Sequence, residues 1–150
     1  MKDELDRLFQ ERDERADKAA AAAQIAKEKA EELRAQALRV ITDVVAPVLR
    51  EFEAELRSRG HGCTASIGES FSTPRATLNF KLAADDPRKS IPESTFTMIA
   101  NPMVSITSEI WTSKGKTSSS GAPLKPLLSI DQEWVRSQVL AFVSRVIKGA

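Results

Sequence analysis

The segment from Ser113 to Gly121, SKGKTSSSG, contains the residue types of a phosphate-binding loop. Its Gly115-Lys116-Thr117 matches the last three positions of G-x-x-x-x-G-K-[ST], in which backbone N–H groups and the lysine hold phosphates. The first glycine of that pattern would occupy position 110, which is Ile110. The Ser/Gly/Pro run that follows cannot continue as a helix, so no ring of helical N–H groups would face a phosphate. We therefore expect no nucleotide here, and we predict a hairpin or loop over residues 113–128.

The only histidine and the only cysteine, His61 and Cys63, lie two residues apart. Residues at this spacing on a strand point to the same side, so the imidazole could activate the thiol as a nucleophile. Cys63 also alternates in phase with the apolar residues Ala65 and Ile67. A cysteine buried in this way is usually unreactive packing, so we predict a reduced, packed thiol. A single cysteine cannot form an internal disulfide and is typical of a reducing compartment.

The acidic residues lack the spacing of a metal site or an acid–base pair. A metal site needs several ligands close together, and Asp85-Asp86 lacks the alternating acids and glycine of a calcium loop. Glu109 falls within a predicted strand, where an ion pair with Lys81 is the simplest role. The sequence therefore predicts no catalytic residue, no metal site and no cofactor, and it favours a protein that is not an enzyme.

The charge balance argues against two classes of partner. The chain has 22 Lys and Arg against 21 Asp and Glu, a net charge of +1, whereas non-specific nucleic-acid or membrane binding usually shows a charge excess. No apolar run approaches the roughly 20 residues that cross a bilayer, and the acidic N-terminus lacks the apolar core of a secretory signal. We expect a cytoplasmic protein with no membrane partner and consider nucleic acid an improbable one.

The elements that position these residues begin with one long predicted helix. Between Lys2 and Arg59 the chain has no glycine and a single proline, Pro47, and strong helix formers dominate. Gly60 supplies the left-handed residue that commonly closes a helix. Pro47 removes a backbone donor, which predicts a kink or break near Ala46.

Apolar residues in the first part of this helix follow a seven-residue repeat. The predicted oligomer interface consists of Phe9, Ala16, Ala19, Ala23, Ala26, Ala30, Leu33 and Ala37. Small core residues let two helices approach closely, so we predict a coiled coil over residues 1–37 that projects from the rest and forms a homo-oligomer, most simply a dimer. The alternative is a solvated single helix, because alanine is also the strongest helix former.

Residues 38–150 are predicted to form an α+β head. The apolar stripe widens from Leu38, as expected for a helix over residues 38–59 that packs on a sheet. The period then drops to two, which predicts four mainly antiparallel strands between about 63 and 112, each with an apolar and a Ser/Thr-rich face. Ser129 or Asp131 begins a final helix over residues 131–148. The fold class is therefore α+β, with a long N-terminal helix, a four-stranded sheet and a C-terminal helix packed on it.

Three functions fit these elements. The favoured one is a non-enzymatic oligomerisation or adaptor protein that joins its copy, or another protein, through the long helix. The second is a nucleic-acid-associated protein that uses the polar sheet face and the 113–126 loop, although such binders usually stack bases on several aromatic residues. The third is an enzyme or small-ligand binder whose site forms between chains. On the polar face, a possible partner surface comprises Lys81, Ile99, Glu109 and Trp111.

Overall fold

The structure is a computed structural model that describes residues 1–70, 73–120 and 124–149. The chain divides into two compact units, Met1–Leu33 and Arg34–Ala150. The boundary predicted from the sequence lay after residue 37. The first unit is helical, because the helix α1 spans Lys2–Val40. The helical backbone continues through a π turn, Ile41–Val45, into α2, Ala46–Ser58.

The irregularity predicted near Ala46 is a π turn within a continuous helix rather than a break. The N–H of Ala46 donates to the carbonyl of Ile41, one residue further back than in an α-helix. Pro47 follows in the first turn of α2, and it has no N–H to donate to a carbonyl of the preceding turn, which its ring would also crowd. The extra residue in the turn therefore accommodates the proline.

Gly60 ends α2 as the sequence predicts. Its φ of 87° lies in the left-handed region, which a side chain would disfavour. The N–H of Gly60 donates to the carbonyl of Arg57 over 3.0 Å, and the N–H of His61 donates to that of Leu56 over 3.1 Å. These two bonds are the Schellman pattern, and they satisfy carbonyls that the helix end would leave unpaired.

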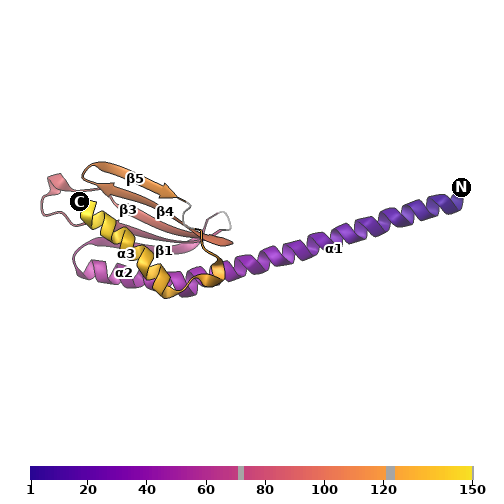
Figure 1. Cartoon of the computed structure of the whole chain (residues 1–150), viewed down its shortest axis with the longest axis horizontal. Coiled ribbons are helices and arrows are strands. Elements are labelled where there is room, and N and C mark those ends of the chain that lie inside the picture. The colour runs from indigo at the N-terminus through magenta and orange to yellow at the C-terminus, as the bar shows by residue number, and fades with distance from the viewer. Residues whose placement is uncertain (71–72, 121–123, 150) are drawn as a thin grey trace. The chain divides into compact units, whose positions relative to one another are not determined.

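Five strands form one antiparallel sheet, one more than predicted (Figure 1). The strands are β1 Gly62–Ser70, β2 Thr73–Lys81, β3 Ser94–Asn101, β4 Met103–Thr112 and β5 Gly115–Ser120. Their order in the sheet is their order in the chain. The prediction of four strands was wrong because β5, with the sequence GKTSSS, falls in the segment predicted to be a hairpin or loop and was not counted as a strand. It has no apolar residue, so the alternation that marks a half-buried strand is missing.

Two helices cover one face of the sheet (Figure 1). The α2 helix packs on β1 and β2. The α3 helix, Gln132–Gly149, packs on β3 and β4. The buried core between them includes Ile41, Val45, Val48, Leu49, Leu78, Phe80, Phe96, Met98, Val104, Val135, Val139 and Phe142. Asp131, rather than Ser129, caps α3, since its Oδ1 accepts the N–H of Trp134 over 2.7 Å. The chain is thus α+β, as predicted, with the final helix packed on the sheet.

Candidate interaction surfaces

The first unit presents its side chains to solvent. Every residue from 1 to 35 is exposed, including Leu5, Phe9 and Leu33 at 46%, 55% and 46% of their surface. We call the exposed apolar heptad positions the α1 seam: Leu5, Phe9, Ala16, Ala19, Ala23, Ala26, Ala30 and Leu33; Arg12 occupies a further position of the same repeat. Ala37, which the sequence assigns to the same interface, is only 2% exposed and packs in the core of the second unit instead. It is therefore unavailable to a partner helix.

Hydroxyl side chains line the sheet face opposite the helices. The strand register places Ser66, Thr77, Thr97 and Thr107 in one row across β1 to β4. The hydroxyl oxygens of Thr77 and Thr97 lie 3.4 Å apart. In the next row, the Thr95 hydroxyl donates to Oδ1 of Asn79 over 3.0 Å. Much of the polarity of this face is therefore satisfied by its own neighbours.

Two of the four predicted partner-surface residues lie together on this face. Glu109 and Trp111 are both on β4, and Lys116 of β5 joins them. The Lys116 Nζ lies 3.8 Å from Oε1 of Glu109 and 5.9 Å from the centroid of the Trp111 ring. Lys116 was not predicted as a strand residue, because the Ser113-Lys114 turn lacks the Asn-Gly or Asp-Gly pair that usually marks a two-residue hairpin.

The other two residues lie elsewhere on the face. Lys81 ends β2, and β3 separates β2 from β4, so the predicted pairing of Lys81 with Glu109 is wrong. Ile99 pairs with Ser105, which is six residues before Trp111 on β4. At a strand rise of about 3.3 Å per residue, Ile99 and Trp111 are on the order of 20 Å apart. Ile99 therefore lies toward the other end of the face from Trp111.

Cys63 is packed in the core, and the histidine beside it has a separate role. The cysteine is 4% exposed and free. Burial, with a smaller contribution from the charge of Glu53, raises the pKa of its thiol to about 11, although Arg57 opposes the shift. His61 Nδ1 accepts the N–H of Ala83 over 3.0 Å. The imidazole therefore holds the chain after β2, and a thiol with this pKa is no nucleophile at neutral pH.

We predict that native Cys63 labels slowly with a thiol reagent at pH 8, and that unfolding in urea increases the rate by orders of magnitude. The folded protein keeps its thiol protonated, with a pKa of about 11. The folded state holds this proton more tightly than the unfolded state, so the free energy of unfolding should also fall as pH rises from about 9 to 11. A Cys63→Ala variant should lack that part of the pH dependence. Rapid stoichiometric labelling of the native protein would contradict the prediction.

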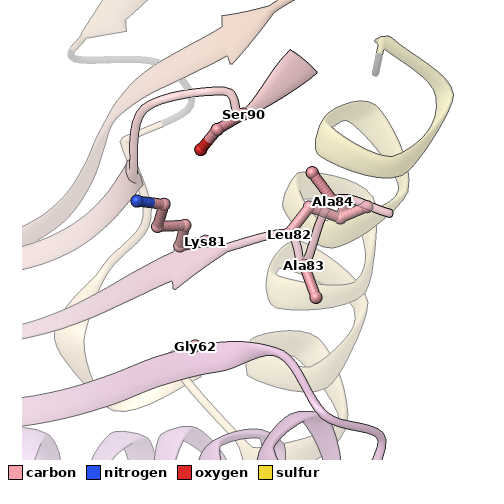
Figure 2. A pocket seen from close by; sticks show the side chains of 6 residues that line it. All are labelled: Gly62, Lys81, Leu82, Ala83, Ala84 and Ser90. Carbon is pink, nitrogen blue, oxygen red and sulfur yellow. The ribbon is translucent and has the colours of Figure 1, made fainter. Parts of the chain in front are cut away.

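An open pocket of about 370 Å³ lies where β2 ends (Figure 2). Gly62, Lys81, Leu82, Ala83, Ala84 and Ser90 line it. Figure 2 shows the Lys81 ammonium and the Ser90 hydroxyl directed to the same side, with small apolar side chains opposite. Lys81 is the only titratable group in this lining, so the pocket lacks the paired groups that acid–base chemistry needs.

Within residues 1–70, 73–120 and 124–149, no three His, Cys, Asp or Glu residues are grouped so that they could hold a metal ion. None of the helices in these described ranges is long and apolar enough to span a bilayer. No family model matches the chain, and comparisons with curated proteins and with solved structures gave no match either.

Proposed function

We propose that this protein is a non-enzymatic adaptor that self-associates through the α1 seam and uses its second unit to bind a partner. The observation that supports the proposal is the exposure of every side chain from residue 1 to 35, with Leu5, Phe9 and Leu33 among them. An isolated helix in water depends on composition alone, and most helical stability in proteins comes from packing of an apolar face. A second helix laid on the seam would provide that packing.

The partner we propose is a second copy of the chain. Alanine at successive core positions lets two helix backbones approach closely, and Phe9 and Leu33 add larger side chains near the two ends. A two-fold dimer is the commonest arrangement for one kind of chain, because a single surface then serves both protomers. The open sheet face and the outer edge of β5 belong to the second unit and not to the α1 seam.

The test is the Ala23→Lys/Ala26→Lys double variant. Both positions lie in the α1 seam, so two lysines per chain would place four like charges in the helix pair and disfavour it. We expect light scattering to give a dimer for the natural chain at tens of micromolar and a monomer for the variant. Thermal unfolding of the second unit, followed by tryptophan fluorescence, should be unchanged.

The matched control is Ala21→Lys/Gln24→Lys, which adds the same charge on the helix surface away from the seam. This control should remain a dimer. A monomeric natural chain, or a dimer that both double variants affect equally, would overturn the proposal.

A further inference from the structure

The sheet has two edge strands, and side chains of α2 occupy part of the β1 edge. Arg57 Nε donates to the carbonyl of Cys63 over 2.6 Å, and the N–H of Ala65 donates to the carboxylate of Glu53. Cys63 and Ala65 are alternate residues of β1, so these are the groups that point away from β2. Exposed strand edges are sites of unwanted pairing, and here two helix side chains occupy the edge of β1.

The direction of the backbone groups in β5 follows from one hydrogen bond. The N–H of Trp111 donates to the Ser94 hydroxyl of β3 over 2.9 Å, so the backbone of Trp111 faces β3. Trp111 pairs with Lys116, which makes this a non-hydrogen-bonded pair of the β4–β5 ladder. The N–H and C=O groups of Lys116 and Ser118 therefore point outward, away from β4. Those of Thr117 and Ser119 point to β4.

The outer edge of β5 is accessible. Lys116, Thr117, Ser118 and Ser119 are all exposed, so solvent reaches both faces of the strand. The helices pack on β1 to β4. Within the described part of the chain, no hydrogen bond engages the outward groups of Lys116 or Ser118. The edge thus offers donors and acceptors at the spacing of a β ladder.

The charge around this edge is mainly positive. Lys114 and Lys116 lie at this edge, whereas Lys125 pairs with Val104 at the other end of β4 and its ammonium lies 4.7 Å from the centroid of the Trp134 ring. The N–H of Ser113 donates to the carbonyl of Gly149 over 3.0 Å, which brings the end of α3, with exposed Lys148, to the turn before β5. Glu109, whose Oε1 lies 3.8 Å from the Lys116 ammonium, offsets one of these charges, and Lys114 and Lys148 leave the edge with a net positive charge.

We propose that the outer edge of β5 binds an extended acidic segment of a partner protein by strand addition. The main-chain groups of Lys116 and Ser118 would pair with the incoming strand, and the surrounding lysines would favour acidic side chains. The six residues of β5, GKTSSS, offer no apolar pocket, so the expected affinity of one edge for the segment is modest. A dimer formed through the α1 seam would present two such edges and so bind a repeated acidic segment more tightly.

The experiment uses the full chain and a fluorescein-labelled synthetic peptide of alternating glutamate and threonine, with fluorescence anisotropy as the readout. We expect saturable binding that weakens as salt is added, since the attraction is between exposed charges. Ser118→Pro should weaken binding about tenfold, because it removes an outward N–H and leaves the inward ladder intact. Ser118→Ala keeps that N–H and should bind as the natural chain does.

Charge reversal gives a second, positive readout. Lys114→Glu/Lys116→Glu should lose the acidic peptide and gain binding to the corresponding lysine–threonine peptide. The Ala23→Lys/Ala26→Lys variant should keep binding per chain, so failure of self-association and failure of this proposal are distinguishable. Three results would overturn the strand-addition proposal. They are the absence of saturable binding, binding by folded Ser118→Pro equal to that of the natural chain, and displacement of the peptide by a single-stranded DNA oligonucleotide at equal concentration.

Discussion

A chain that ends at residue 128 should not unfold cooperatively. The α3 helix contributes Val135, Val139, Phe142, Val143 and Val146 to the core, each at most 5% exposed. Burial of one such side chain contributes about 1.5–3 kcal/mol, so the five together contribute about 8–15 kcal/mol. That range is comparable with the whole stability of a domain, about 5–15 kcal/mol. The apolar faces of β3 and β4 would be exposed without the helix.

Thermal denaturation followed by circular dichroism, together with binding of a hydrophobic dye, measures this effect. We expect the shortened chain to be insoluble, or to bind the dye and melt without a sharp transition. A chain that lacks residues 1–33 instead removes the first unit and should keep a cooperative transition. A soluble fragment of residues 1–128 with one sharp transition would show that α3 is dispensable.

Phe96→Ala should lower the free energy of unfolding by about 3–5 kcal/mol. The Phe96 side chain is 2% exposed, and its ring centroid lies 5.5 Å from that of Phe142. Removal of the ring would leave a cavity between β3 and α3, and the surrounding backbone can close it only in part. Urea denaturation followed by tryptophan fluorescence gives the change in free energy.

Leu140→Ala is the matched control for Phe96→Ala. Leu140 lies on α3, like Phe142, but is 59% exposed, so its truncation should cost less than about 0.5 kcal/mol. The contrast separates loss of packing from any general weakening of the fold. Equal effects of the two substitutions, or a loss below about 1 kcal/mol at Phe96, would mean that α3 and the sheet do not share a tightly packed core.

The sequence predicted most of the elements because their burial is periodic. Heptads and an unbroken run of helix formers mark α1, and Gly60 marks the end of α2. The strands β1 to β4 alternate between apolar and hydroxyl side chains because one face packs on helices. β5 escaped prediction because neither face is covered, so burial leaves no period in its sequence. Backbone pairing with β4 holds it, together with contacts of Lys116 and Ser119 to β4 side chains that no periodic pattern reveals.

The candidate surfaces were only partly predictable for a related reason. The α1 seam is a local pattern on one helix, and the sequence displays it directly. The contacts of Glu53 and Arg57 with β1 join a helix to backbone groups of a later strand, and backbone groups carry no sequence signal. The grouping of Glu109, Trp111 and Lys116 depends on the register of a hairpin. It becomes visible only when that register is known.

The order of the strands has a consequence for the newly made chain. Each strand pairs with the one made immediately before it, so every ladder closes over a short stretch of chain and can form early during synthesis. The α3 helix follows all five strands, however, and reaches the ribosome exit last of these elements. Until then the apolar side of β3 and β4 lacks its cover. We expect nascent chains in that interval to be the form of this protein most dependent on chaperones.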